Sequence, residues 1–244
     1  MKNHTQAQSV RKQLELKSYE QFLLAKKQFA PFHLLIVVIS LSFVSCGPNN
    51  HEPAKITFKD HMAAEKKTIE NMKSAYAGEV NAAAKYQAFS LQADKEGYHH
   101  IAVLYKAVSA SENIHATNHK AVIEDAGSSV PVTNPSFVVK TTKENLTDDI
   151  EGETEEAKTM YPEFLKTAET AENHIAFLSL TYAMKSEKKH KFFFEQALGD
   201  INSNTLNSLP WVYFVCPVCG NTYATAPKHC DFSLTEGSKF IKFE

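Results

Sequence analysis

The chain has 244 residues, of which 43% are hydrophobic and 22% charged, and its formal net charge is −2. This composition suits a globular protein with one medium domain and a small one, and it lacks the basic excess of a nucleic-acid-binding protein. Eight glycines favour helices over a turn-rich β fold, and four cysteines, three of them clustered, exclude a disulfide framework.

The first 46 residues have the pattern of a secretion signal. Residues 32–44 are almost all apolar, but a helix of that length spans only about 20 Å, short of the roughly 30 Å hydrocarbon core of a bilayer. Lys26 and Lys27 precede this run, and the sequence FVSCG overlaps its end. The pattern predicts a signal peptide at 1–46 that resembles a bacterial lipobox, with Cys46 as the lipid attachment point. An uncleaved anchor and simple secretion are the alternatives.

The rest of the chain predicts a mainly α protein. Residues 47–60 are polar and predict a linker that tethers a folded domain to a membrane surface. From residue 61 to 203 the hydrophobic period is helical and predicts a four-helix bundle. The first helix ends at Gly97 and the second at Gly127. A small domain is predicted at 204–244.

The third helix carries two local signals. Thr141 and Glu144 have the spacing of a capping box, so the helix is predicted to begin there, after a connection at 127–137. Pro162 lies inside the helix and should kink it, because proline removes one backbone donor and crowds the preceding turn.

Each of the four helices places carboxylates on its apolar face. An ionised carboxylate is costly to bury unless it pairs or binds a metal ion. One such residue would be explained by a helix register misjudged by one position, but five require a common cause. The glutamates on these faces are Glu79, Glu112, Glu153, Glu156 and Glu187.

Two of these glutamates begin an E-x-x-H motif. His115 follows Glu112 and His190 follows Glu187 by three positions, so the two side chains of each pair share a helix face. A third match, at 96–99, lies at a helix break and is interpreted as a surface coincidence. Glutamates from two helices and E-x-x-H motifs from two others form the ligand pattern of ferritin-like di-iron bundles. This oxygen-rich set with two imidazoles suits iron or manganese.

The C-terminal segment predicts a metal knuckle with three thiols. Cys216 and Cys219 form a C-x-x-C motif, and Cys230 follows eleven positions later. A second C-x-x-C would place a cysteine at position 233, where the chain has Ser233. A hydroxyl is nearly isosteric with a thiol, so Ser233 is the candidate fourth ligand, with a water molecule as the alternative. His229 is adjacent to a cysteine and poorly placed to reach the same ion. Iron, zinc and no metal remain open.

Taken together, these motifs resemble the rubrerythrin family. The resemblance covers about residues 62–244, and its segments occur in the family's order and spacing. They are SAYAGEVNAAAKY at 74–86, SENIH at 111–115, GETEEAKTMYPEF at 152–164, EKKH at 187–190 and the CPVCG knuckle. The resemblance implies a ferritin-like di-iron bundle followed by a rubredoxin-like domain.

The resemblance also implies roles for individual residues. By position, the di-iron ligands are Glu79, Glu112, His115, Glu153, Glu156, Glu187 and His190. Glu112 and Glu187 match bridging carboxylates. Glu156 and His115 match two groups that exchange on one iron as its oxidation state changes.

Three more residues near these ligands are ambiguous. Tyr86 and Tyr161 match tyrosines that contact the ligands in the family, although ordinary aromatic core positions explain them equally well. His119 lies one turn beyond a predicted ligand. One interpretation is that it contacts a metal ligand, and the preferred one is a solvated or hydrogen-bonded histidine.

The implied function is reduction of hydrogen peroxide to water in defence against oxidative stress. Such an enzyme is an NADH-linked oxidoreductase that receives electrons through partner proteins and its rubredoxin-like centre. The alternative is a ferroxidase subunit of an iron-storage shell, but a storage shell has no need of an attached electron-transfer domain. A structural module with relic metal sites is a third hypothesis, and the intact ligand set argues against it.

The expected cofactors are two irons in the bundle and one iron, or zinc, in the knuckle. The expected partners are hydrogen peroxide, an unidentified electron donor and a second copy of the chain in a homodimer, with no nucleic acid. The signal pattern predicts a lipid-anchored protein of the bacterial cell envelope, with a soluble periplasmic protein as the alternative.

Overall fold

The computed structural model describes residues 57–205 and 209–244. The predicted signal peptide, Cys46 and most of the predicted linker lie outside these residues. Within the described ranges, none of the helices combines the length and apolar character that crossing a membrane requires.

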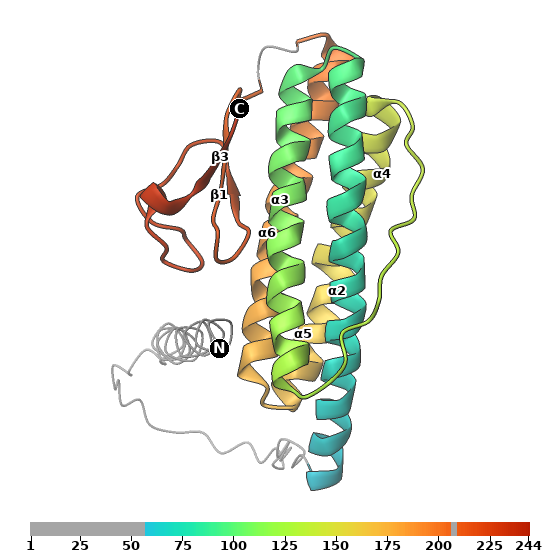
Figure 1. The fold of residues 1–244 in the computed structure, drawn as a ribbon, viewed down its shortest axis with the longest axis vertical. Helices are drawn as coiled ribbons and strands as arrows, with labels where there is room; N and C mark the ends of the chain where they lie inside the picture. Colours follow the sequence, from blue (N-terminus) through green and yellow to red (C-terminus); the bar gives the residue numbers. More distant parts are fainter. Residues whose placement is uncertain (1–56, 206–208) are drawn as a thin grey trace, which may run out of the picture. The chain divides into compact units, whose positions relative to one another are not determined.

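Long helices make up most of the described chain (Figure 1). Their bounds are α2 Phe58–Lys95, α3 His99–Asp125, α4 Thr142–Glu155, α5 Tyr161–Thr170 and α6 His174–Ser203. Helices α2 and α3 end just before Gly97 and Gly127, where the backbone φ angles are +84° and +67°. Such left-handed positions favour glycine and stop a helix, as the sequence predicts.

The connection between α3 and α4 is long, whereas the other helix connections are short. Its residues, 126–141, run along the length of the bundle in Figure 1. One long crossover of this kind is the topology of ferritin-like bundles. The predicted capping box then starts α4, with the Thr141 side chain accepting from the Glu144 backbone and the Glu144 side chain accepting from the Thr141 backbone.

The third helix of the bundle is interrupted where proline was expected to kink it. A single π-helical turn, η1 (Glu156–Met160), separates α4 from α5, and Pro162 occupies the first turn of α5. Proline has no N–H to donate and is tolerated in the first turn of an α-helix, so the restart of the α-helix at Tyr161 accommodates Pro162. The π-helical turn also shifts the buried face by one residue. Met160 lies one helical turn after Glu156, so a regular 3.6-residue period predicts that it faces inward with Glu156. Instead Tyr161 is fully buried and Met160 only partly buried.

Two apolar clusters fill the bundle, one toward each end. The first contains Phe89, Leu104 and Phe194, and the second contains Met72 and Leu180. Along α2, α3 and α6 the predicted metal-ligating residues fall between the two clusters. The polar site is therefore enclosed by apolar packing at both ends.

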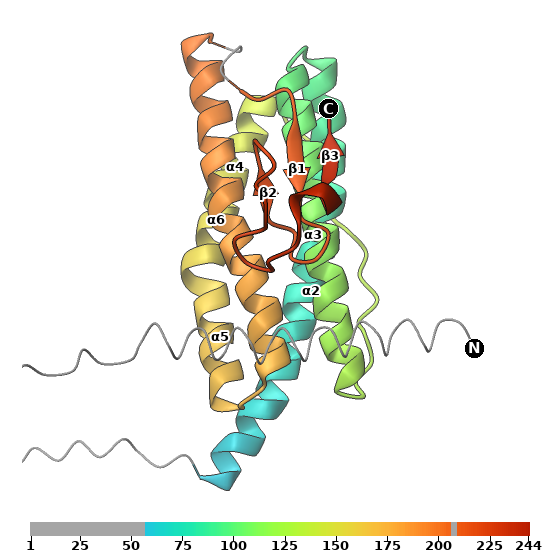
Figure 2. The same ribbon diagram turned by 90° about the vertical axis from the view of Figure 1, so that its left-hand side faces the viewer.

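The small C-terminal domain consists of a three-stranded antiparallel sheet and two turns. The strands are β1 Tyr213–Val215, β2 Thr222–Tyr223 and β3 Ile241–Phe243, in the order β2-β1-β3, with a short 3₁₀ turn η2 (Gly237–Lys239). All three strands contact α3, and β2 also contacts α6. The turned view shows the domain against these helices (Figure 2). The predicted fold class, a ferritin-like bundle with a rubredoxin-like knuckle, is confirmed.

Candidate metal centres

The bundle brings six of the seven predicted donors into two overlapping groups. One group contains Glu79, Glu112, His115 and Glu187, and the other contains Glu112, Glu153, Glu187 and His190. Within each group the ligand atoms lie within 4.8 Å of one another. The groups share two glutamates, from α3 and α6. This is the arrangement that two adjacent cations with two bridging carboxylates require.

The two histidines face the shared glutamates in a reciprocal way. The Nδ1 atom of His115 lies 2.8 Å from Glu112 Oε2 and 3.2 Å from Glu187 Oε1. The Nδ1 atom of His190 lies 2.8 Å from Glu187 Oε2 and 3.1 Å from Glu112 Oε1. Each E-x-x-H motif thus directs both of its side chains to the same point between α3 and α6, because positions three apart share a helix face.

Several of these buried atoms lack a hydrogen-bond partner. They include Glu153 Oε2, both carboxylate oxygens of Glu187 and His190 Nδ1. His190 Nδ1 and Glu187 Oε2 are only 2.8 Å apart, but their alignment is poor for a hydrogen bond. Buried polar atoms are normally paired, so donors that converge without pairing fit metal coordination.

The charges of the cluster point to the same conclusion. Burial raises the pKa of the Glu187 carboxyl, and the charge of Glu112 raises it further. Burial and the charge of Glu187 likewise raise the pKa of Glu153. Burial alone would lower the pKa values of His115 and His190, but the surrounding carboxylates outweigh it and raise both. The cluster has an excess of negative charge, which two metal cations would neutralise.

The three ambiguous residues all lie against the cluster. Tyr86 donates its hydroxyl to Glu153 Oε1 at 2.6 Å, and Tyr161 donates to Glu79 Oε1. Both tyrosines also belong to the apolar clusters, so each serves as core and as support for a ligand. His119 is fully buried, with Nδ1 2.7 Å from Ser179 Oγ.

His119 also contacts the carboxylate of α2. Its Nε2 atom lies 3.7 Å from Glu79 Oε1. Burial alone would raise the pKa of Glu79, but the nearby imidazoles of His115 and His119 outweigh burial and lower that pKa. His119 is therefore a hydrogen-bonded histidine that supports a ligand, rather than a solvated one.

Glu156 stands apart from the other donors. It begins the π-turn and is absent from both four-residue groups. Burial raises the pKa of its carboxyl, and the nearby charges of Glu79 and Glu187 raise it further. Its side chain is thus close to the cluster without being part of it.

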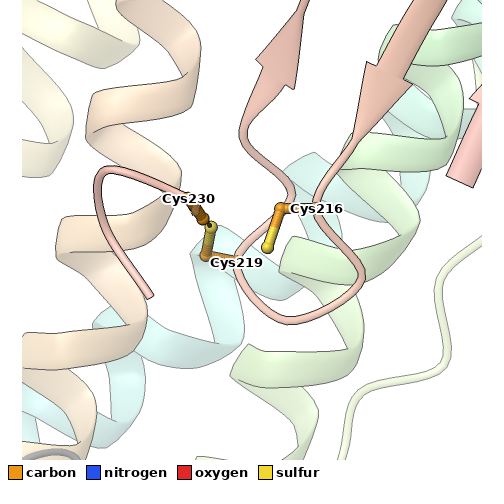
Figure 3. A group of neighbouring side chains, drawn as sticks. All are labelled: Cys216, Cys219 and Cys230. Atoms are coloured by element: carbon orange, nitrogen blue, oxygen red, sulfur yellow. Dashed lines mark hydrogen bonds between the residues drawn. The ribbon is translucent and has the colours of Figure 1, made fainter. Parts of the chain in front are cut away.

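The knuckle contains a second candidate metal site. Cys216, Cys219 and Cys230 are buried, form no disulfide, and have sulfur atoms within 4.8 Å of one another (Figure 3). The side chains converge from two turns of the domain. Three buried thiols at this separation fit a metal ion that binds thiolates. The alternative donor His229 is exposed and lies outside this group.

The knuckle contacts both of the histidines that are predicted to bind metal. His115 Nε2 lies 3.2 Å from the backbone oxygen of Cys219, and His190 Nε2 lies 3.2 Å from Thr222 Oγ1. Each imidazole therefore has one nitrogen toward the glutamates and the other toward the knuckle. A metal-ligating histidine usually pairs its second nitrogen in this way, which fixes its orientation.

Helix α3 holds the knuckle turn through additional hydrogen bonds. Ser111 Oγ donates to the oxygen of Gly220 at 2.6 Å, and Asn118 Nδ2 donates to the oxygen of Val218 at 2.9 Å. The close approach requires glycine at 220, because a Cβ there would lie 2.4 Å from His115 Nε2.

Sequence reasoning missed Ser111, Asn118 and Thr222. A retrospective signal exists for Ser111 and Asn118, since each lies one turn from His115 on the same helix face. Thr222 contacts the bundle only because the knuckle packs on it, and no local pattern marks such a contact.

Comparisons with known proteins agree with this geometry. The rubrerythrin family model matches residues 70–198. Rubrerythrin-2 of Clostridium acetobutylicum is 37% identical over 156 residues, covering 64% of this chain and 84% of the relative. Nigerythrin of Nitratidesulfovibrio vulgaris is 34% identical over 164 residues, covering 66% and 78%. A structure of fully reduced, all-ferrous nigerythrin superposes with a TM-score of 0.65 at 31% identity, covering 72% of this chain and 86% of that one.

The chain belongs to the rubrerythrin family, as the motifs predict. Family membership and the two donor groups together confirm the predicted cofactors. These are a di-iron centre in the bundle and a metal ion in the knuckle.

The shared glutamates generate the first prediction. Glu112→Ala combined with Glu187→Ala should abolish iron binding in the bundle, because both four-residue groups lose two donors. The control is Glu151→Ala combined with Glu155→Ala, which removes two exposed glutamates of α4 and the same charge. Metal analysis after anaerobic reconstitution, with circular dichroism to verify folding, measures the effect. Full bundle iron in a folded Glu112/Glu187 variant would show that the ligands lie elsewhere.

The pKa shifts generate a second prediction, for the protein stripped of metal. The folded pKa of Glu187 is above its ordinary value of 4.5, and that of His115 is above 6.5. The folded state therefore holds protons that the unfolded state releases, and stability is lost as pH rises through this range. The lowered pKa of His119 opposes this trend below pH 6.5, but the raised pKa values of Glu153 and His190 reinforce it.

The melting temperature of the metal-free protein should therefore fall between about pH 5.5 and about pH 8. Glu187→Gln should flatten the slope, whereas Glu195→Gln, an exposed site on the same helix, should leave it unchanged. Added ferrous iron should raise the melting temperature most at high pH, because metal binding displaces protons. A melting temperature that is constant or rises with pH would contradict this account.

Proposed function

We propose that this protein is a di-iron peroxidase that reduces hydrogen peroxide to water, with electrons delivered through the knuckle. The observation that carries the proposal is the contact of the knuckle with a metal-ligating histidine, His115 Nε2 to the oxygen of Cys219 at 3.2 Å. A thiolate-bound metal ion beside this turn would be joined to the bundle by one hydrogen bond and one imidazole.

The overall reaction consumes two electrons and two protons for each peroxide and yields two waters. When bound, a ferrous pair supplies both electrons together, so cleavage of the O–O bond need not release a radical. The chain supplies the enclosure. The site lies between two apolar clusters, and Glu187 and His190 are fully buried. This burial excludes bulk water from the reacting groups.

The tyrosines orient the carboxylates and hold their own protons. Burial raises the pKa of both Tyr86 and Tyr161 well above the ordinary value, and the charges of Glu153 and Glu79 respectively add to the effect. Each hydroxyl therefore stays protonated and donates to one ligand oxygen. This hydrogen bond fixes which lone pairs of the carboxylate remain for a cation.

Glu156 is proposed to be the mobile carboxylate of the site. The described arrangement includes His115 in a donor group and leaves Glu156 outside both groups. The family resemblance implies that these two residues exchange on one iron, and the π-turn gives Glu156 a backbone that departs from regular helix at that point. With its raised pKa, the Glu156 carboxyl is suited to carry a proton toward a departing oxygen.

The electron donor is proposed to be an NADH-linked reductase system acting through a small electron-transfer protein. Storage of iron as a ferroxidase is the alternative function. The knuckle favours the peroxidase, since its contacts with both histidines serve electron delivery and have no evident use in storage.

The protein is also proposed to be lipid-anchored at Cys46 in a bacterial cell envelope and to form a homodimer. The first proposal rests on the FVSCG sequence, and the second on the family resemblance.

Peroxide turnover tests the proposed function. Anaerobically reduced protein should oxidise rapidly when mixed with hydrogen peroxide and more slowly with oxygen, with two iron equivalents oxidised per peroxide consumed. Stopped-flow absorption gives both rates, and gel filtration reveals whether a storage shell forms. Oxygen-driven accumulation of an iron core, without peroxide turnover, would favour storage instead.

The contact between α3 and the knuckle generates a separate prediction. Ser111→Ala combined with Asn118→Ala removes two donors to the knuckle backbone and no metal ligand. Electron transfer from the knuckle to the bundle should slow about tenfold or more, because the two centres lose their alignment. Metal content should be unchanged. Thr117→Ala, at an exposed position of the same helix, is the control.

Unaltered transfer in the Ser111/Asn118 variant would exclude this contact from the electron route. A second experiment mixes chains that lack the bundle ligands with chains that lack the knuckle cysteines. It distinguishes a contact within one chain from a contact between two chains. Recovered activity in mixed dimers means that it forms between chains.

The anchoring proposal has its own test. Cys46→Ala should yield an unlipidated protein that leaves the membrane fraction, because no thiol remains for lipid attachment. Mass spectrometry of the mature chain and cell fractionation measure the change. An identical mature mass and unchanged fractionation would refute lipidation at Cys46.

A further inference from the structure

The two turns of the knuckle have the same backbone hydrogen bonds. In the first turn the N–H of Cys216 donates to the oxygen of Asn221 at 3.0 Å, and in the second the N–H of Cys230 donates to the oxygen of Thr235 at 2.8 Å. A second bond, from the fifth residue of the turn to the oxygen of the first, is 3.0 Å long in both. The segments 216–221 and 230–235 are therefore structurally equivalent.

This equivalence places Ser233 in the position of a cysteine. Cys219 is the fourth residue of the first turn, and Ser233 is the fourth residue of the second. The fifth residues, Gly220 and Leu234, both have positive φ angles, +76° and +58°. A leucine in this left-handed region is strained, and such strain persists only where the surrounding structure determines the turn.

The side chains of the two turns meet. Ser233 Oγ lies 3.2 Å from Cys216 Sγ, and Cys219 Sγ lies 3.3 Å from Cys230 Sγ. Sulfur ligands about 2.3 Å from a tetrahedral ion are separated by about 3.8 Å, so Cys219 and Cys230 would move apart by about half an ångström to hold one. Ser233 is 1% exposed, and its oxygen also lies 2.8 Å from Thr235 Oγ1. Its hydroxyl thus faces the thiols rather than solvent.

We propose that Ser233 Oγ is the fourth ligand of an iron ion held by Cys216, Cys219 and Cys230, and that the Thr235 hydroxyl donates to this oxygen. The proposal rests on the electron-transfer role proposed above. A hard oxygen ligand in place of a thiolate favours the ferric state and lowers the reduction potential. The hydrogen bond from Thr235 partly offsets this, because it withdraws charge from the ligand.

This ligand set gives the site two chemically different sides. The turn that contains Cys219 contacts His115 and the bundle, so the electron leaves through a thiolate ligand. The turn that contains Ser233 carries the oxygen ligand. A lower potential strengthens the driving force into the di-iron centre and requires a more strongly reducing external donor.

The test compares variants of the whole chain, reconstituted with ferrous iron without oxygen. Ser233→Cys should raise the reduction potential and give the absorption of a tetrathiolate iron site. Thr235→Val should lower the potential further. Ser233→Ala should change the visible thiolate-to-iron absorption and reduce knuckle iron occupancy. Ser238→Ala, an exposed hydroxyl of the same domain, is the matched control and should change none of these.

The readouts are metal content, visible absorption, the EPR signal of an isolated ferric ion and spectroelectrochemical titration. None of these readouts requires peroxide turnover. If the variants shift the potential and absorption as expected but the protein does not turn over peroxide, Ser233 is supported as a ligand and the proposed peroxidase function is not. A potential and spectrum of Ser233→Cys identical to those of the natural chain would overturn the proposal. A natively purified knuckle that holds only zinc, or no metal, would overturn it as well.

Discussion

The structure depends on negative charge buried between two apolar clusters. Helices α2, α3, α4 and α6 each bring glutamate to the middle of the bundle, where the carboxylates outnumber the imidazoles beside them. The apolar packing buries these carboxylates but does not supply hydrogen-bond donors to all of their oxygens. Both oxygens of Glu187 lack a hydrogen-bond partner, and burial raises the pKa of its carboxyl. Bound cations would neutralise these carboxylates, so metal binding and the stability of the folded bundle are coupled.

The same imidazoles connect the bundle to the knuckle. A histidine that binds metal through Nδ1 can still form a hydrogen bond through Nε2. In this protein the Nε2 atoms of His115 and His190 both face the knuckle. His115 meets a backbone oxygen and His190 meets Thr222. Docking of the small domain therefore orients the predicted ligands of the large one. A variant that disturbs the docking surface is expected to affect metal geometry and electron delivery together.

Local periodicity in the sequence was enough to predict the helices and their inner faces. Helical spacing placed the acids on those faces, and Gly97 and the Thr141 capping box marked real helix ends. The π-turn was not predicted, because a regular 3.6-residue period gives no indication of an inserted residue. As a result, the buried position is Tyr161 rather than Met160. The role of Thr222 was also hidden, since it arises only when a distant segment packs on the bundle.

Asp149 shows why a buried acid in a helix does not by itself identify a ligand. It lies one turn before Glu153 on the same face of α4 and is equally buried. Yet Lys85 Nζ approaches it at 2.9 Å and Tyr105 donates to it at 2.8 Å, so its charge is matched by protein groups. Glu153 accepts one hydrogen bond, from a tyrosine hydroxyl. The imidazole of His190 lies 3.8 Å from Glu153 and is closer to two other glutamates. The distinction between a structural carboxylate and a metal ligand therefore lies in which neighbour supplies the positive charge, and only the three-dimensional structure reveals that neighbour.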